Sequence, residues 1–357
     1  MDANTFLAQM VALGGSDAHL KVGQPPGVRI AGRIRPQGDQ PLSPGDTEAF
    51  ARAVLADRQW ETFLATGDVD CSYSVPGVAR FRVNAMRQRG SISLVLRFIP
   101  ERIPTFKELG LPEVCRTLAT KPRGLVLVTG PTGSGKSTTL AAMIDAINSS
   151  QEGHILTMED PIEFLHRDKK SYINQREVGT DTVDFNQALR RALRQDPDII
   201  LVGEMRDLET ISLAVTAAET GHLVLATLHT TSATKTVDRV VNVFPPVQQT
   251  MVRMQLAGTL QGIISQSLVA KVGGGRVAAL EILVVNDAAR ALIREDKMVQ
   301  LQSVMQTGKK QGMQTLEGHL NDMIAAKLVT YEEAIAHANS PELIRRPATE
   351  TLVSTHS

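Results

Sequence analysis

The strongest chemical signal is a glycine-rich segment that ends in a lysine and a serine. Residues 130–137 read Gly-Pro-Thr-Gly-Ser-Gly-Lys-Ser and match the pattern G-x-x-x-x-G-K-[ST] in full. Glycines let backbone N–H groups wrap around phosphate oxygens, and the following helix N-terminus adds its partial positive charge. We expect Lys136 to reach the β- and γ-phosphates and Ser137 to ligate Mg²⁺. The expected nucleotide-binding residues are Gly130, Pro131, Thr132, Gly133, Ser134, Gly135, Lys136, Ser137 and Thr138.

Carboxylates follow two further apolar segments. The run 199–202 is followed by Gly203 and Glu204, an arrangement in which the acid holds the Mg²⁺ shell, here through water. The segment 157–163 places Glu159, Asp160 and Glu163 at the end of another expected strand. Phosphoryl transfer to water needs a group that orients and deprotonates the nucleophile. Glu163 is the candidate base, with Glu159 and Asp160 as alternatives or structural neighbours.

Two histidines and a group of arginines are further candidates. His222 and His229 bracket the expected strand 223–228, and either pack in the core or sense and polarise the nucleotide site. A zinc site is disfavoured because no cysteine or carboxylate cluster accompanies them. The arginines of residues 79–99 indicate a solvated sheet face, a nucleic-acid patch, or charges that reach a γ-phosphate from outside the site. They are Arg80, Arg82, Arg87, Arg89 and Arg97.

Alternating segments are expected to position these residues. Expected strands at 124–129, 154–158, 198–202 and 223–228 alternate with expected helices at 137–147, 185–194 and 208–220, which predicts a parallel sheet in an α/β domain. Before it, a helix at 4–13, short strands at 18–22, 27–30 and 32–34, a helix capped by Ser43, and an antiparallel meander over 69–99 predict a small α+β unit. A run of helices is expected from 246 to 340.

Length and composition bound the function. A chain of 357 residues with 42% hydrophobic residues favours two domains. Lys+Arg and Asp+Glu are both 38, so the net charge of zero argues against a general grip on nucleic acid or anionic lipid, and 4% aromatic residues argue against a base-stacking platform. Two cysteines exclude a disulfide framework and a four-cysteine zinc site, and favour a reducing cytosol. No secretory signal or membrane-spanning run is expected.

Four motifs carry a resemblance to a known family. They are GPTGSGKSTTLAAM at 130–143, HILTMEDPIEF at 154–164, RALRQDPDIILVGEMRD at 191–207 and TAAETGHLVLATLHTTSATKTVDRVVNVFP at 216–245. With GGSDAHLKVGQPPGVRIAGRI at 14–34, they resemble the secretion-type hexameric ATPases, and among them most closely the type IV pilus retraction (twitching motility) ATPases. The resemblance covers residues 1 to 343 and implies a PAS-like N-terminal domain at 1–99, a linker at 100–112, a RecA-like ATPase domain with C-terminal helices at 113–346, and a disordered tail at 347–357.

The resemblance also implies a mechanism. It implies a cytoplasmic homohexameric ring, recruited to the inner face of the inner membrane at the pilus base, that hydrolyses ATP with Mg²⁺. Glu163 falls on the family's catalytic base, Glu204 on its Mg²⁺-mediating glutamate, and Arg82 and Arg97 on its phosphate-reaching arginines. His222 and His229 fall in its His box. Ring motion would turn an inner-membrane platform protein so that pilin subunits leave the fibre, and no stable binding of nucleic acid is expected.

Two features bear on the position within the family. Extension and type II secretion ATPases usually carry a tetracysteine zinc insert, which two cysteines cannot form. Retraction ATPases carry a helix resembling AIRNLIRE, whereas residues 288–295 here read AARALIRE and depart at Ala289 and Ala291. The alternatives are an accessory retraction ATPase, an assembly or secretion ATPase, and, from another class, a RecA-like nucleic-acid translocase.

Overall fold

The chain divides into two compact units. The computed structural model describes residues 2–100 and 102–347. The first unit extends to residue 102 and also includes Pro161–Leu165 and Glu177–Asp181, while the second contains the remaining described residues. Two short segments from the later part of the chain are therefore packed with the first unit.

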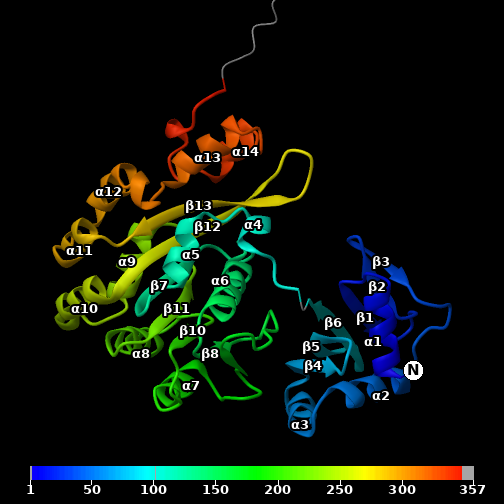
Figure 1. Ribbon diagram of the computed structural model, residues 1–357. Coiled ribbons are helices and arrows are strands. Elements are labelled where there is room, and N and C mark those ends of the chain that lie inside the picture. Colours follow the sequence, from blue (N-terminus) through cyan, green and yellow to red (C-terminus); the bar gives the residue numbers. More distant parts are fainter. Residues whose placement is uncertain (1, 101, 348–357) are drawn as a thin grey trace, which may run out of the picture. The chain divides into compact units, whose positions relative to one another are not determined.

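The first unit is a six-stranded antiparallel sheet with helices on one face (Figure 1). Alternate β5 residues Phe81, Val83 and Ala85 share a core with Leu7 and Phe50 from the helices, whereas Arg80 and Arg82 alternate with them and lie on the other face. The predicted meander and the Ser43 cap are confirmed, the latter as a capping box with Asp46. The elements are α1 (Ala3–Ala12), β1 (Asp17–Lys21), β2 (Gly27–Ile30), β3 (Arg33–Pro36), α2 (Pro44–Val54), α3 (Asp57–Thr66), β4 (Asp68–Val75), β5 (Ala79–Gln88) and β6 (Ser91–Ile99), in the sheet order β3-β2-β1-β6-β5-β4.

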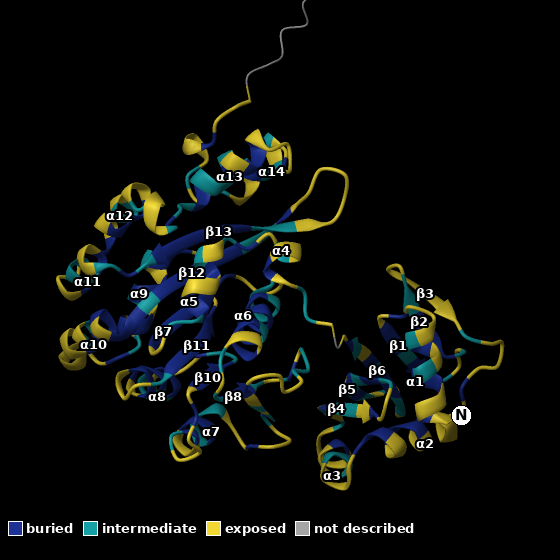
Figure 2. Cartoon of the chain, in the orientation of Figure 1, coloured by how far each residue is buried: buried dark blue, intermediate teal, exposed yellow. Residues whose placement is uncertain are grey.

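The second unit is built on a seven-stranded sheet in the order β13-β12-β7-β11-β10-β8-β9. Its strands are β7 (Gly124–Thr129), β8 (His154–Glu159), β9 (Tyr172–Glu177), β10 (Ile199–Val202), β11 (Leu223–Leu228), β12 (Leu260–Ala270) and β13 (Arg276–Val284). The run from β8 through β10, β11 and β7 to β12 is parallel, and every residue of β7, β10 and β11 is buried (Figure 2). Burial on both faces explains why these strands read as continuous apolar runs.

Helices cover both faces of this sheet. Leu125 and Leu127 of β7 belong to one apolar cluster, whereas Val126 and Val128 belong to another on the opposite face. The helices from α4 to α10 are α4 (Phe106–Leu109), α5 (Glu113–Ala119), α6 (Lys136–Ser150), α7 (Phe185–Ala192), α8 (Leu208–Glu219), α9 (Ala233–Asn242) and α10 (Pro246–Thr259). The predicted alternation of strands and helices is therefore confirmed. Among the described residues, no helix combines the length and apolar character needed to span a membrane.

The predicted run of helices from 246 to 340 is wrong in its middle part. Residues 260–284 form the antiparallel pair β12–β13, and β12 also pairs with β7. A short apolar run does not distinguish a buried strand from a buried helix, and here the β-branched Ile263 and Ile264 favour the strand. The remainder is helical, in α11 (Asp287–Arg294), α12 (Leu301–Thr307), α13 (Leu316–Ala325) and α14 (Tyr331–His337). Of the predicted tail 347–357, residues 348–357 lie outside the described part of the chain.

Candidate nucleotide site

The glycine-rich loop connects the end of β7 to the start of α6. Gly130, Gly133 and Gly135 have φ angles of 145°, 78° and 88°, a region of backbone conformation that favours glycine. A Cβ atom on Gly130 would lie 2.1 Å from the carbonyl oxygen of Gln266, so a side chain there is excluded. Gly135 is the N-cap of α6 and no side chain caps this helix end, which leaves first-turn N–H groups for a phosphate.

The side chain of Lys136 forms hydrogen bonds with the backbone of the glycine-rich loop. Its Nζ atom donates to the carbonyl oxygens of Gly130, at 2.8 Å, and Pro131, at 3.1 Å. The ammonium group therefore lies in the bend of the loop, where it can exchange these neutral acceptors for charged phosphate oxygens. Ser137 and Thr138 follow on the first turn of α6, where both are half-buried.

A residue that sequence reasoning missed supports this loop from β12. The Nε2 atom of Gln266 donates to the carbonyl oxygen of Ser134 at 2.6 Å, and its Oε1 atom accepts from the Thr139 hydroxyl at 2.9 Å. Next to it, the hydroxyls of Thr129 and Ser265 share a hydrogen bond of 2.6 Å. The parallel register that pairs β12 with β7 brings these groups together. Only a correct strand assignment for 260–270 could have revealed them.

Glu204 lies shortly after β10, and its carboxylate contacts Arg206 and His229. Its Oε1 atom lies 2.7 Å from Nε of Arg206 and 2.9 Å from Nε2 of His229, and its Oε2 atom lies 2.7 Å from Nη2 of Arg206. Burial alone would raise the pKa of Glu204, but the hydrogen bonds and charges of Arg206 and His229 outweigh it and lower that pKa. The carboxylate is therefore ionised at neutral pH.

The parallel sheet places the loop, Glu204 and His229 at one edge. β7, β11 and β10 are neighbours in this order and run in the same direction, so the residues after each strand lie at the same edge of the sheet. His222 precedes β11 and lies at the opposite edge, where its Nδ1 atom is 3.0 Å from the carbonyl oxygen of Ala217. A six-residue strand spans about 20 Å, so His222 is not brought to the loop of its own chain.

The arginines of the first unit differ in what they contact. Arg82 and Arg97 are cross-strand neighbours on β5 and β6 and both are exposed, although Nε of Arg97 lies 2.9 Å from Oδ1 of Asp17. Arg80 forms an ion pair of 2.9 Å with the buried carboxylate of Glu177. Arg87 lies over the ring of Phe63. Arg82 and Arg97 thus form an exposed pair, as a phosphate-reaching role requires.

The three carboxylates of 157–163 also have different surroundings. Glu159 accepts hydrogen bonds from the hydroxyl of Thr157, at 2.7 Å, and from Nε2 of Gln175, at 3.1 Å. Asp160 and Glu163 are exposed. Glu163 belongs to the first unit with Arg82 and Arg97, whereas Glu159 and Asp160 belong to the second.

The donor set fits a hard divalent cation that is shared with a phosphate. Among the residues the structure describes, no group of three or more His, Cys, Asp or Glu side chains could hold a metal. Ser137 and Glu204 offer oxygen ligands, which Mg²⁺ prefers, and Mg²⁺ usually completes its shell with substrate phosphates and water. The loop therefore has the features of a phosphate-binding site, and Ser137 and Glu204 are oxygen ligands of the kind that Mg²⁺ takes.

Residues 288–294 of the segment 288–295 lie on α11 and Glu295 is its C-cap residue, and the two departures from the family motif have different surroundings. Ala289 is fully buried in the larger apolar core of the second unit, while Ala291 is half-buried. Arg290, which matches the motif, donates from Nη1 to the carbonyl oxygens of Ala257 and Gly258 at 2.6 and 3.1 Å. This arginine therefore ties α11 to the end of α10.

Comparisons with known proteins identify the family of the chain. Residues 68–336 match the family model described as type II/IV secretion system protein. The chain is 54% identical over 342 residues to the type IV pilus retraction ATPase PilT of Pseudomonas aeruginosa. The alignment covers 96% of this chain and 99% of that protein. It is 50% identical over 318 residues to a twitching motility protein of Neisseria gonorrhoeae, with 89% and 85% covered. A crystal structure of the pilus retraction motor PilT with bound ADP matches with a TM-score of 0.90 at 50% identity, covering 96% of this chain and 98% of that one.

Proposed function

The chain belongs to the type II/IV secretion system protein family, and from that premise we propose that it is the ATPase that powers retraction of type IV pili. The observation that carries the proposal is the phosphate-binding loop on a parallel sheet, with Glu204 and His229 at the same edge, in a chain 54% identical to a pilus retraction ATPase over 96% of its length. The predicted α/β class and family membership are confirmed.

The second unit supplies the nucleotide site. ATP binds with its phosphates in the loop 130–135, where Lys136 exchanges two carbonyl acceptors for the β- and γ-phosphates. Ser137, through its hydroxyl, and Glu204, through water, would hold Mg²⁺, and the bound ion would neutralise charge on the phosphates. The Nε2 atom of His229 lies 2.9 Å from Glu204, so the imidazole is placed to respond to a change in charge when the nucleotide binds. His222 lies at the opposite edge of the sheet and takes no step in its own chain's site.

The first unit supplies the groups that complete hydrolysis. Glu163 orients and deprotonates the attacking water, and its exposure leaves the carboxylate accessible for this role. Arg82 and Arg97, adjacent across β5 and β6, stabilise the charge that develops on the γ-phosphate. In this proposal the phosphate-binding loop belongs to the second unit, and Glu163 and the two arginines belong to the first.

The working form is a homohexameric cytoplasmic ring at the inner face of the inner membrane. The ring engages the inner-membrane platform of the pilus and acts on pilin only through it. A net charge of zero and few aromatic residues disfavour a nucleic-acid translocase. ATPase activity that DNA stimulates, with a salt-dependent affinity for DNA, would contradict this part of the proposal.

Deletion of the gene, with complementation by variants, tests the function. Cells without the protein should keep surface pili, or carry an excess of them, and should lose twitching. Lys136→Ala should fail to restore twitching because it cannot bind the phosphates, and Glu163→Gln should fail although the purified protein binds ATP. Loss of pili in the deletion strain would instead make the chain an assembly ATPase. Turnover by purified Glu163→Gln would refute the assignment of the base.

A further inference from the structure

We propose that Glu177 is a positioning residue for the reaction, because it fixes the segment that carries Glu163 to strands β4 and β5. The inference rests on the proposed function, in which Glu163 is the general base. Sequence reasoning did not single out Glu177, which lies 14 residues after Glu163 at the end of β9.

Three donors from three separate segments converge on one oxygen of Glu177. Its Oε2 atom accepts from the hydroxyl of Ser72 on β4 at 2.9 Å, from Nη2 of Arg80 on β5 at 2.9 Å, and from the backbone N–H of Ile162 at 3.0 Å. Glu177 is 2% exposed. One buried carboxylate therefore joins the sheet of the first unit to the residue that immediately precedes Glu163.

Glu177 also forms hydrogen bonds with residues that directly follow it in the chain. The Oε1 atom of Glu177 accepts from the hydroxyl of Thr180 at 3.3 Å, and its backbone N–H donates to Oδ2 of Asp181 at 2.8 Å. Both carboxylate oxygens are thus engaged, and the backbone turns directly after the strand. These contacts fix the rotamer of Glu177 and therefore the point at which the Ile162 N–H is held.

Charge and burial make this network sensitive to the loss of one member. The side chains of Arg80 and Glu177 are 18% and 3% exposed, so removing Arg80 leaves a buried carboxylate without its partner, and removing Glu177 leaves a half-buried guanidinium without its partner. Ile162 is 3% exposed and is anchored, whereas the next residue, Glu163, is exposed. The Cα of Glu163 is held while its side chain remains accessible, which is the arrangement that a base needs when a small displacement costs rate.

The network keeps Glu163 in one compact unit with the two arginines. Pro161–Leu165 and Glu177–Asp181 belong to the same compact unit as β5 and β6, which carry Arg82 and Arg97.

The first test is Glu177→Gln, with Tyr73→Phe as a matched control. The Gln variant keeps the shape of the side chain but loses the charge that pairs with Arg80. Tyr73→Phe also removes a hydrogen bond of β4, the 2.8 Å bond from its hydroxyl to Asn4, without contacting Glu177. We expect Glu177→Gln to accelerate hydrogen exchange of the Ile162 amide by about 10-fold and to lower kcat by about 100-fold, with ATP affinity within about twofold of wild type. The control should leave all three unchanged.

Arg80 gives a second route if Glu177→Gln does not fold. Arg80→Met should lower kcat as Glu177→Gln does, and Arg80→Lys, which keeps the charge, should recover part of it. The double variant Arg80→Met/Glu177→Gln should be no slower than the worse single variant, because both single changes break one network. Full additivity of the two effects on kcat would overturn the proposal.

The outcomes separate this inference from the proposed function. If Glu163→Gln still hydrolyses ATP, the assignment of the base is wrong, and the positioning role of Glu177 is refuted together with it. If Glu163→Gln is inactive but Glu177→Gln keeps both its kcat and its Ile162 protection, only the positioning role is refuted. Faster exchange at Ile162 with an unchanged kcat would also refute it, because the anchor would then be structural alone.

Discussion

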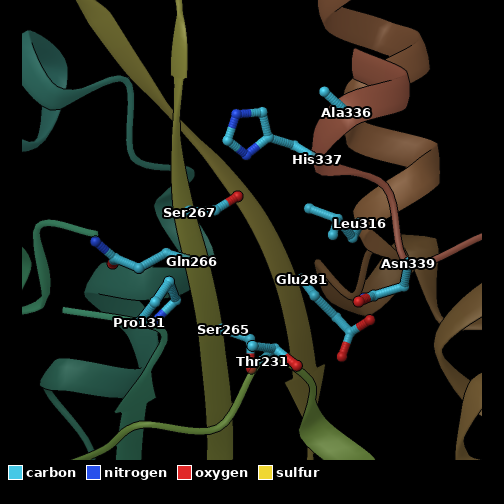
Figure 3. Close-up of a pocket in the computed structure, with 10 residues that line it drawn as sticks. All are labelled: Pro131, Thr231, Ser265, Gln266, Ser267, Glu281, Leu316, Ala336, His337 and Asn339. Atoms are coloured by element: carbon cyan, nitrogen blue, oxygen red, sulfur yellow. The ribbon is translucent and has the colours of Figure 1, made fainter. Parts of the chain in front are cut away.

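The side-chain amide of Gln266 donates a 2.6 Å hydrogen bond to the carbonyl oxygen of Ser134, so a strand 132 residues later in the chain holds the phosphate-binding loop. The same side chain accepts from Thr139 on α6 at 2.9 Å. Gln266 is 4% exposed, and it lies beside Pro131 at the edge of a cavity (Figure 3). The curvature of the loop therefore depends on β12 as well as on its own glycines.

Gln266→Ala should weaken nucleotide binding and stability together. The change leaves the Ser134 carbonyl and the Thr139 hydroxyl without a buried partner, at about 1–3 kcal/mol for each group. We expect the free energy of unfolding to fall by about 2–4 kcal/mol and ADP affinity to fall about 10-fold, as measured by urea unfolding and titration calorimetry. Gln255→Ala, which removes only the contact of an α10 glutamine with Glu219, is the control. Unchanged ADP affinity in Gln266→Ala would contradict the bracing role.

Substitutions of two loop glycines should differ sharply in severity. Both Gly130 and Gly133 have positive φ, so alanine strains the backbone by about 1 kcal/mol at either position. At Gly130 the added Cβ also lies 2.1 Å from the Gln266 carbonyl oxygen, whereas at Gly133 it meets nothing within 4 Å. We expect Gly133→Ala to lose about 1 kcal/mol of unfolding free energy and Gly130→Ala to lose at least about 3 kcal/mol. Equal thermal shifts for the two variants would show that the loop relaxes freely.

The features that the sequence predicts well are local. The phosphate-binding loop, Glu204 and His229 each lie directly after a continuous apolar run, and parallel strands then place them at a common edge. The position of His222 follows from the same topology, because a residue before a strand lies at the opposite edge from a residue after it. From the sequence, His222 was kept beside His229 as a site candidate, although the two histidines bracket one expected strand.

The features that the sequence could not reveal depend on pairing between distant segments. The contact of Gln266 with the loop depends on residues 260–270 forming a strand beside β7, whereas the sequence pattern predicted a helix there. Glu177 reaches Ser72 and Arg80 across about a hundred residues of chain, as the sequence separations of 105 and 97 show. The resemblance to the family singled out Arg82 and Arg97 among the five arginines, but nothing in the sequence indicated that Arg80 pairs with a buried carboxylate.

Arg206→Ala should change the metal dependence of the ATPase. Arg206 contacts both oxygens of Glu204, at 2.7 Å each, so under the proposed function it would compete with the water shell of Mg²⁺ for that carboxylate. We expect the half-saturating Mg²⁺ concentration to fall severalfold in the variant. Titration of the ATPase with Mg²⁺ measures this, with Arg190→Ala as the control, because Arg190 pairs instead with Glu209 at an exposed site.

The same variant should move the acid limb of activity to higher pH. Hydrogen bonds from Arg206 are the largest influence that lowers the pKa of Glu204 against the opposing effect of burial. Without them the pKa rises, so protonation removes the functional carboxylate at a higher pH than in the wild type. Rates measured across pH 4–7 at saturating Mg²⁺ should show the shift. An unchanged acid limb would mean that Arg206 does not control the ionisation of Glu204.

Glu281→Gln should stabilise the protein at neutral and alkaline pH. Glu281 is 2% exposed and borders a cavity of about 220 Å³ with Asn339 and Thr231 (Figure 3), where its Oε1 atom accepts from the N–H of Ala233 at 2.7 Å. Burial, reinforced by the negative charge of Glu317, raises its pKa from 4.5 to about 6. The folded chain therefore holds this proton to a higher pH than the unfolded chain, and stability falls as pH rises from 4.5 to 6.

Above that window the cost of the buried charge is constant, at about 2 kcal/mol for a shift of this size. Glutamine keeps an oxygen for the Ala233 N–H and does not ionise, so Glu281→Gln should gain about 2 kcal/mol of unfolding free energy at pH 8 and almost none at pH 4. Urea unfolding at the two pH values measures the difference, and the exposed Glu332→Gln should show no such dependence. A Gln variant that is less stable than the wild type at pH 8 would mean that the carboxylate charge is used by the fold, through the N-terminus of α9, rather than tolerated by it.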